Sequence, residues 1–489
     1  MKVVLLAAFL LFSFGAKADK IVLLDDVRES LQARADYILT AQESIRAQYF
    51  TIDNDHLSRS ALALTLNAVN RNPNLKVKIL VDSMHNLMLR ETMAALLGNN
   101  HPERAKNIEI REYNKFNLFH PFRYTKRMHD KGLIIDGKFM ISGGRNVANG
   151  YYGQANNTNG LASPVFEDSD ALVLDSPVVD EATVYFDQLW NSKFVSKLQL
   201  LDYSEDGLAP EYCLRQIRDQ DLCERRQRIR LKKIRAEEEA LQGLIRDYNE
   251  NRLRVMAEVV DWNSHAIEVT SIDFLFDAVV GQKSNLKKLP NGIGTQLYAA
   301  IAKATDSVVI LTPYLVITPE QEELFRTLRS NNVEVTIITN SKGSNDVGAA
   351  YVGYEKTRHK ALDLGVKIFE YQGPDTLHAK MVLIDRSIMF IGSYNWDFRS
   401  QNLNREVGIL AQLPEDKDNE LSLNLINKFA RILKKSCKVG ARICHANPNF
   451  NIENLTQQEV DDLMTAFKLR EQNRNSLYRF LYPLIKGQL

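Results

Sequence analysis

The sequence is poor in the features that mark membrane-spanning and nucleic-acid-binding proteins. Its N-terminal hydrophobic run, Val3–Gly15, falls short of the roughly 20 residues that a bilayer span needs. Charge of neither sign prevails, since 62 Lys and Arg residues stand against 61 Asp and Glu residues. Proteins that act on nucleic acid ordinarily carry a basic field, so this balance weighs against that class. No spacing typical of a metal site is present, and we expect neither a metal nor another cofactor.

The N-terminus resembles a secretory signal peptide. One lysine, the hydrophobic run and then Ala16-Lys17-Ala18 give the charged, apolar and cleavage regions of such a peptide. We expect cleavage of residues 1–18, which leaves a mature chain that begins at Asp19. The predicted location is periplasmic or secreted, with association to a membrane surface as a further option. An uncleaved membrane anchor is the alternative.

Cysteine is scarce, and its four positions fit an exported protein. Cys213 lies near Cys223, and Cys437 lies near Cys444. Local pairs are the simplest of the three possible connectivities, and disulfides persist in oxidising compartments. We therefore predict the disulfides Cys213–Cys223 and Cys437–Cys444. Four reduced cysteines in a cytosolic enzyme are the alternative.

A polar motif interrupts a predicted β-hairpin in the first half of the chain and recurs in the second. MHDKGLIIDGKFMISGGRN holds a histidine, a lysine two residues later, an aspartate at the turn, glycines and an asparagine. LHAKMVLIDRSIMFIGSYN repeats this frame. A match of this length within the same strand–turn–strand context indicates an internal repeat. The matched positions are His129, Lys131, Asp136, Gly143, Gly144 and Asn146, and then His378, Lys380, Asp385, Gly392, Ser393 and Asn395.

The repeat extends beyond the motifs to a common order of predicted elements. Each half has the order strand, helix, strand, helix, strand and motif hairpin. Apolar strands that alternate with helices predict mixed sheets covered on both faces. We predict an α/β protein of two similar mixed-sheet halves, packed with pseudo-twofold symmetry and with both motifs at the interface. The predicted halves are residues 19–204 and 265–436, with a helical insert at 205–264 and a C-terminal helical extension at 437–489.

The paired motifs resemble the HKD motifs of the phospholipase D superfamily. The sequence around them, including FEDSDALVLDSPVVDEATVYFDQLW and GSYNWDFRSQNLNREVGIL, is most similar to bacterial cardiolipin synthases of the C type. The resemblance covers roughly residues 25–200 and 265–435 and implies a phospholipase D-like fold. One departure is Gly144, which stands where the second motif has Ser393.

Cleavage of a phosphodiester needs a nucleophile, a proton donor and groups that neutralise its charge. Histidine titrates near neutral pH and can fill the first two roles, while Lys131, Lys380, Asn146 and Asn395 offer donors to the phosphoryl oxygens. The resemblance implies a phosphohistidine intermediate, with His129 as nucleophile and His378 as acid and then base, although these roles could be exchanged.

The resemblance also implies an acidic residue beyond each motif that orients the opposite histidine. The matching positions are Asp168 and Glu406, with Glu167 and Asp170 as alternatives to the first. Asp136 and Asp385 are expected to hold the hairpin turns.

The expected substrate is a phospholipid at a membrane surface, with water or an alcohol as acceptor. The expected activity is that of a phospholipase D or a cardiolipin synthase-like phosphatidyltransferase, and no obligate protein partner is predicted. An exported nuclease of the same superfamily is the alternative, and a catalytically silent binding protein is a third reading that two intact motifs disfavour.

The insert between the halves is rich in charge. Cys223–Met256 has helix-forming residues throughout, with a basic first part. We interpret it as a solvated helix with i,i+4 pairs such as Lys233–Glu237; the alternative is a basic surface that binds anionic lipid.

Overall fold

The computed structural model is an α/β body built on two large mixed sheets. It describes residues 19–84, 90–97, 106–115, 125–153, 157–158, 161–162, 165–198, 203–204, 207–208, 220–250, 259–278, 292–415 and 420–440. The predicted signal peptide and most of the predicted C-terminal extension lie outside these residues. No helix among the described residues is long and apolar enough to cross a bilayer.

The first sheet has nine strands in the order β11-β4-β3-β2-β5-β6-β10-β1-β14. Parallel pairs join β2, β3 and β4, and antiparallel pairs join the motif hairpin to β2 and β10. The strands are β1 (Asp19–Leu24), β2 (Ser44–Tyr49), β3 (Lys76–Asp82), β4 (Ile108–Tyr113), β5 (Lys131–Ile135), β6 (Phe139–Gly143), β10 (Asp170–Leu174), β11 (Val195–Lys197) and β14 (Ile267–Val269).

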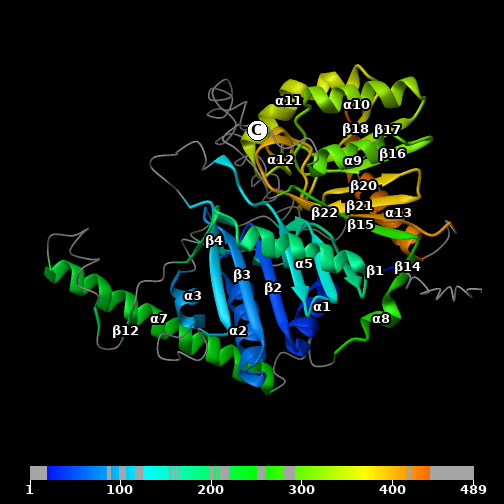
Figure 1. The fold of residues 1–489 in the computed structure, drawn as a ribbon. Helices are drawn as coiled ribbons and strands as arrows, with labels where there is room; N and C mark the ends of the chain where they lie inside the picture. The colour runs from blue at the N-terminus through cyan, green and yellow to red at the C-terminus, as the bar shows by residue number, and fades with distance from the viewer. Residues whose placement is uncertain are drawn as a thin grey trace, which may run out of the picture.

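Helices cover both faces of this sheet (Figure 1). The helices α1 (Val27–Thr40), α2 (His56–Arg71) and α3 (Arg90–Leu97) share a hydrophobic core with one face. Helix α5 (Pro177–Trp190) lies on the other face and shares a core with residues of the second half. The alternation of apolar strands and amphipathic helices in the sequence produces this layered arrangement.

The second sheet has eight strands in the order β15-β22-β21-β20-β16-β17-β18-β23. The strands are β15 (Ser271–Phe276), β16 (Ser307–Leu311), β17 (Glu334–Asn340), β18 (Lys367–Tyr371), β20 (Met381–Ile384), β21 (Ile388–Gly392), β22 (Val407–Gln412) and β23 (Ser436–Lys438). Its helices are α9 (Ile293–Ile301), α10 (Pro319–Ser330), α11 (Gly348–Leu362), α12 (Phe398–Asn402) and α13 (Glu420–Lys434).

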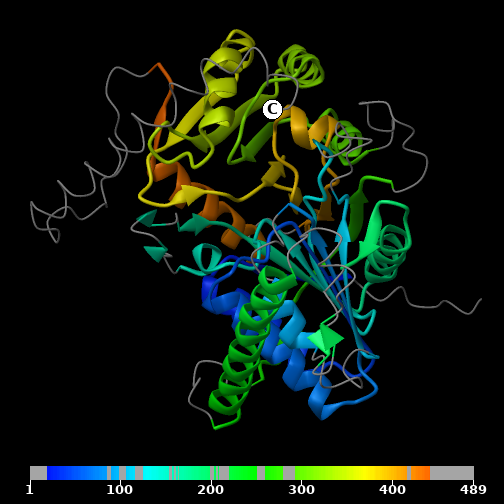
Figure 2. The same ribbon diagram turned by 90° about the vertical axis from the view of Figure 1, so that its left-hand side faces the viewer.

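One hydrophobic core joins the two halves. It contains residues of α5 and β10 from the first half and of β20, β21, β22 and α13 from the second. The repeated order of strand, helix, strand, helix, strand and hairpin is confirmed, as is the α/β class with two mixed sheets. Figure 2 shows the two halves stacked, with the helices α10 and α11 on the outer side of the second.

Short elements complete the chain. They are β7 (Asn157–Thr158), β8 (Leu161–Ala162), β9 (Phe166–Glu167), β12 (Tyr203–Ser204), β13 (Gly207–Leu208), β19 (Thr376–Leu377), the 3₁₀ helix η3 (Asn149–Tyr152) and α8 (Trp262–His265). The pair β9 and β19 runs parallel and joins the two halves beside the motifs.

Two edge strands cross the predicted segment boundaries. Strand β14 lies within the range assigned to the second half but pairs with β1 of the first sheet, so the halves divide between Val269 and Ser271. Strand β23 begins at Ser436 and pairs with β18, so the second sheet runs into the predicted C-terminal extension. Both strands sit at sheet edges, where pairing depends on tertiary contacts that a short sequence window does not reveal.

The longest described element of the predicted insert is the helix α7 (Gln220–Asn249), which packs on the first half. Its buried side contributes Ile234, Leu241 and Ile245 to the core with α2 and α3. The predicted pair Lys233–Glu237 is wrong, because Glu237 binds Arg59 of α2 at 2.8 Å. The helix is thus solvated on one side only.

The structure tests the cysteine prediction only in part. Cys437 in β23 is disulfide-bonded. Cys213, Cys444 and the side chain of Cys223 lie outside the described residues, so both predicted pairings stay predictions.

Candidate active site

An aspartate closes each motif hairpin by binding the backbone of a neighbouring strand. Asp136 (φ 54°) and Gly137 (φ 65°) are the two central residues of the turn between β5 and β6, in the left-handed region that such turns need. The Asp136 carboxylate accepts the backbone N–H groups of residues 42–44. Asp385 accepts those of residues 305–307 in the same way. Both aspartates therefore hold their hairpins against the start of the neighbouring strand.

The two motif histidines contact carboxylates from opposite halves of the protein. His129 Nδ1 lies 2.9 Å from Glu406 Oε2. His378 Nδ1 lies 2.6 Å from Asp168 Oδ2. All four side chains are buried. A carboxylate at Nδ1 favours the tautomer with its proton there, which leaves the lone pair of Nε2 for chemistry.

Backbone hydrogen bonds between the two halves hold these histidine–carboxylate pairs in place. The His129 N–H donates to the Arg405 carbonyl at 2.9 Å, and the His378 N–H donates to the Glu167 carbonyl at 2.8 Å. Each histidine is therefore held next to the residue that precedes its carboxylate partner. The site depends on both halves, and neither half contains it alone.

The acids next to Asp168 in the sequence have other partners. Glu167 binds Lys428 of α13 at 2.9 Å, and Asp170 binds Arg34 of α1 at 2.8 Å. Among the three candidate acids, Asp168 is the one whose carboxylate hydrogen-bonds to His378.

The motif lysines and asparagines surround the histidines. Lys131 Nζ donates to the His129 carbonyl at 2.7 Å, and Lys380 Nζ lies 2.6 Å from His378 Nδ1 and 3.1 Å from its Nε2. Asn146 donates to the Tyr151 hydroxyl at 2.8 Å. The buried Asn395 Oδ1 has no hydrogen-bond partner among the described residues. The structure thus brings together all six predicted polar groups of the two motifs.

Burial controls the protonation of these groups. It lowers the pKa of His129 to about 4 and that of His378 to about 3, so both imidazoles are neutral at pH 7. Burial and the charge of Lys380 lower the pKa of Lys131 to about 7, and burial lowers the pKa of Lys380 to about 8. Burial opposes ionisation of Asp168, but Lys380 and His378 outweigh it and hold the pKa of that carboxyl well below its usual range.

Within the described ranges, no group of three or more His, Cys, Asp or Glu side chains is placed to hold a metal ion. The expectation of a metal-independent site is not otherwise tested.

Sequence and structure comparisons place this arrangement in a known family. The family model described as "Cardiolipin synthase, PLD-like domain" matches residues 35–190 and 297–433. The chain belongs to this phospholipase D-like family. Cardiolipin synthase C of Escherichia coli (strain K12) is 26% identical over 400 residues, which cover 76% of this chain and 77% of that relative.

Two further matches span most of the chain. Cardiolipin synthase 1 of Staphylococcus epidermidis is 23% identical over 438 residues, covering 89% of this chain and 72% of that relative. The crystal structure of phosphatidylserine synthase from Haemophilus influenzae Rd KW20 aligns with 97% of this chain and 98% of its own, with a TM-score of 0.59 and 16% identity. At that identity the structural match supports the phospholipase D-like fold.

The Gly144/Ser393 difference between the motifs has a steric explanation. A Cβ atom at Gly144 would lie 2.0 Å from Asp168 Oδ1, so the Asp168 carboxylate occupies that space. The Ser393 hydroxyl instead donates to Glu406 Oε2 at 2.5 Å. The other two motif glycines also allow close approach of a neighbouring strand: Gly143 and Gly392.

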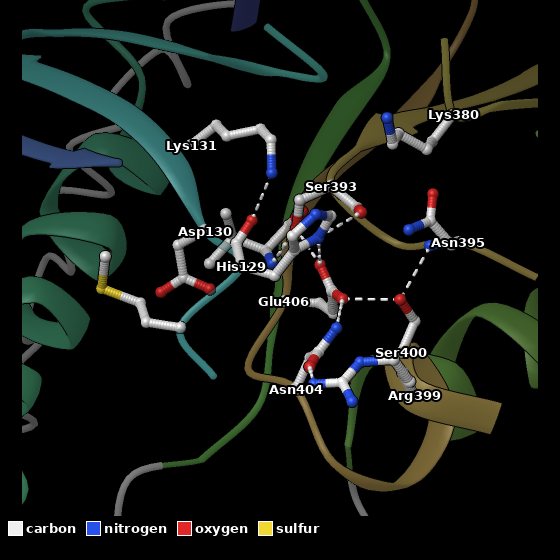
Figure 3. A network of polar contacts seen from close by, with 12 residues as sticks. His129, Asp130, Lys131, Lys380, Ser393, Asn395, Arg399, Ser400, Asn404 and Glu406 are labelled. Atoms are coloured by element: carbon white, nitrogen blue, oxygen red, sulfur yellow. Dashed lines mark hydrogen bonds and ion pairs between the residues drawn. The ribbon is translucent and has the colours of Figure 1, made fainter. Parts of the chain in front are cut away.

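A set of hydrogen bonds around Glu406 completes the phospholipase D-like site (Figure 3). Ser400 Oγ donates to Glu406 Oε1 at 2.6 Å, and Asn404 Nδ2 donates to the same oxygen at 3.3 Å. With Ser393 and His129, these donors satisfy both carboxylate oxygens. Sequence reasoning missed Ser400 and Asn404, although both lie in the same segment as Glu406.

Aromatic rings also border both histidines, and the sequence analysis did not identify them. Phe50 packs edge-on against His129 with 4.9 Å between ring centroids. Tyr151 packs edge-on against His378 at 5.1 Å, and its hydroxyl lies 3.4 Å from His378 Nε2. These rings exclude water and limit the rotation of each imidazole.

Proposed function

We propose that the protein is a phospholipase D-type phosphodiesterase and phosphatidyltransferase that acts on phospholipid through a phosphohistidine intermediate. The observation that carries this proposal is the pair of crossed contacts, His129 with Glu406 and His378 with Asp168, beside two buried lysines. Two imidazoles that each have a carboxylate at Nδ1 suit a reaction with one nucleophile and one proton carrier, because Nε2 is the nitrogen left for chemistry.

In the proposed first step, His129 Nε2 attacks the phosphorus atom. A nitrogen–phosphorus bond forms as the bond from phosphorus to the headgroup oxygen breaks, and His378 gives its Nε2 proton to that oxygen. The proton stays on His129 Nδ1 and is donated in a hydrogen bond to the Glu406 carboxylate, whose negative charge stabilises the positive charge that develops on the ring.

His378 can act as an acid only when its ring is a cation, and the negative charge of the bound substrate favours that form. In the free site, burial holds the pKa of His378 at about 3. A bound phosphodiester brings a negative charge next to the imidazole, which favours its cation and raises its pKa. The same charge favours the ammonium forms of Lys131 and Lys380.

In the proposed second step, an acceptor attacks the phosphohistidine. His378 now takes the proton of water or of an alcohol, the new oxygen–phosphorus bond forms, and the bond to His129 breaks. Water gives phosphatidic acid, whereas an alcohol such as a second phosphatidylglycerol gives a new phosphatidyl ester.

Phospholipid is the substrate class that sequence similarity supports. The matched family model is described as a cardiolipin synthase, and relatives of that name align with more than two thirds of this chain. The near-balanced charge of the chain agrees with this choice, because it provides no general basic field for a nucleic acid.

The test is incubation of the protein with isotopically labelled phosphatidylglycerol or phosphatidylethanolamine, followed by mass analysis of the products. Phosphatidic acid or cardiolipin is the expected product, and it should be lost in His129→Ala. Cleavage of an oligonucleotide without turnover of either lipid would favour the nuclease alternative.

We also propose that the protein is exported after cleavage behind Ala18. The sequence supports this proposal, because one lysine, a hydrophobic run and then Ala16-Lys17-Ala18 give the three regions of a cleavable signal peptide. N-terminal sequencing of the protein from its native host should begin at Asp19, and a chain that retains Met1 would contradict the proposal.

A further inference from the structure

The first part of α7 has an outer face that combines apolar and basic side chains. Leu222 is 40% exposed and Ile229 is 51% exposed. They are seven residues apart, so both lie on one side of the helix. Exposed cations flank them on both sides: Arg225, Arg226, Arg228, Lys232, Lys233 and Arg235. We call these eight residues the α7 outer face.

The α7 outer face lies opposite the side that packs on the protein. Ile234, Leu241 and Ile245 form the buried side, about half a turn away from Ile229. Figure 2 shows α7 on the outside of the first half, running along the surface. Among the described residues, neither Leu222 nor Ile229 belongs to a hydrophobic core.

The cations of this face exceed the acids that could neutralise them. Residues 224–235 contain seven basic residues, of which Arg230 lies 3.5 Å from Glu91 of α3, and the single acid Glu224, which lies 3.9 Å from Arg228 in an exposed pair. Asp221 and Glu239 lie about one turn before and one turn beyond this run. Glu237, one turn beyond Lys233, is bound by Arg59 and by the Thr92 hydroxyl. The charge is thus concentrated on a surface about 20 Å long, given a rise of roughly 1.5 Å per residue.

We propose that the α7 outer face docks the protein on the surface of an anionic phospholipid bilayer. Ile229 and Leu222 would enter the boundary between headgroups and acyl chains, and the cations would extend to the headgroup phosphates. The choice of a bilayer rests on the proposed function, which needs the protein at a lipid surface. A nucleic acid would also bind the cations, but it offers no favourable environment for the two aliphatic side chains.

The test is sedimentation of the full-length protein with vesicles at low and high salt. One set of vesicles is phosphatidylcholine alone, and the other also contains phosphatidylglycerol. Wild-type protein should bind the second set, and salt should weaken binding. Replacing Arg225, Arg228 and Lys232 with Gln should weaken partitioning by roughly tenfold or more at low salt, and Ile229→Asn should weaken it at both salt concentrations.

A matched control removes the same charge from other surfaces. Lys138, Lys303 and Arg386 are exposed, and their triple replacement by Gln should leave vesicle binding near the wild-type level. Thermal unfolding of each variant shows that the fold is intact. Equal losses in the two triple variants, or unchanged binding in the α7 variant, would overturn the inference.

Two further outcomes separate this inference from the proposed function and from nucleic acid binding. Turnover of a soluble short-chain phospholipid by the wild-type protein tests the active site without a bilayer, so its failure counts against the proposed function alone. Oligonucleotide binding that depends on the three cations and is unaffected by Ile229→Asn, with no vesicle binding, would replace the lipid surface with a nucleic acid.

Discussion

Substitution of Gly144 by alanine should damage one of the two catalytic pairs and spare the other. The added Cβ would lie 2.0 Å from Asp168 Oδ1 and 2.7 Å from its Cγ. A carbon atom and a carboxylate oxygen that are not bonded normally lie more than roughly 3 Å apart. The carboxylate must therefore move by about 1 Å. The Gly144 backbone cannot yield easily, because its N–H is bonded to the Ser169 carbonyl at 3.0 Å. The movement would break or lengthen the 2.6 Å contact with His378.

The expected cost follows from this displacement. A misplacement of about 1 Å in a catalytic constellation lowers the rate by about 10²-fold, which corresponds to about 2.7 kcal/mol of transition-state stabilisation. If His378 is the proton donor, the loss depends on the leaving group. We expect about 10²-fold lower kcat on a substrate with an alkyl leaving group and a much smaller loss on one that releases nitrophenol, which departs without a proton.

Two variants serve as controls for Gly144→Ala. Gly243→Ala in α7 adds the same methyl group where the nearest atom, Arg246 Nη2, is 3.8 Å away, and its activity on soluble substrate should match the wild type. Glu406→Gln weakens the pair of His129, so it should lower the activity on both substrates equally. A folded Gly144→Ala with wild-type kcat on the alkyl substrate would refute the steric argument, and equal losses on the two substrates would refute the assignment of His378 as acid.

Three further predictions concern the support of the site and its charges. Ser400→Ala removes the 2.6 Å bond to Glu406 and should lower kcat by about tenfold, with recovery in Ser400→Thr as the discriminating readout. Lys428→Met separates buried ion pairs between the halves and should reduce the free energy of unfolding in urea by about 3 kcal/mol, whereas Lys434→Met on the exposed side of α13 should not. Burial lowers the pKa of His129 to about 4, that of His378 to about 3 and that of Lys131 to about 7. As the pH falls from above 7, kcat/KM should rise, because Lys131 gains its proton and the proton that His378 takes up on substrate binding becomes more available, and it should decline toward pH 4 as the His129 imidazole gains a proton. A profile centred on the ordinary histidine pKa would contradict the buried site.

The repeated motif made the centre of the site predictable from the sequence. The spacing within each hairpin fixes which side chains share a face, and strands of this kind place them reproducibly. The repeat also made the two-sheet architecture predictable, because each half repeats the same order of elements. The partners of His129 and His378 came from the family resemblance, since nothing local in the sequence links residues that far apart.

Features that depend on tertiary packing could not be read in the same way. Ser400 lies in a short helix, and its role becomes visible only when that helix is folded against Glu406. The edge strand β14 is three residues long and gains its place from the partner strand β1. Lys233 lies four residues before Glu237, a spacing that allows an ion pair on a helix. Arg59 of another helix binds Glu237 instead, because a guanidinium offers two parallel donors.

The most direct test of the proposed mechanism is to locate the covalent intermediate. The protein is mixed with labelled phospholipid, quenched within a turnover under conditions that preserve nitrogen–phosphorus bonds, digested and mapped by mass spectrometry. The label should be on the peptide that contains His129 and absent from His129→Ala. Label on His378 would exchange the two roles, and turnover without label on either histidine would contradict the phosphohistidine mechanism.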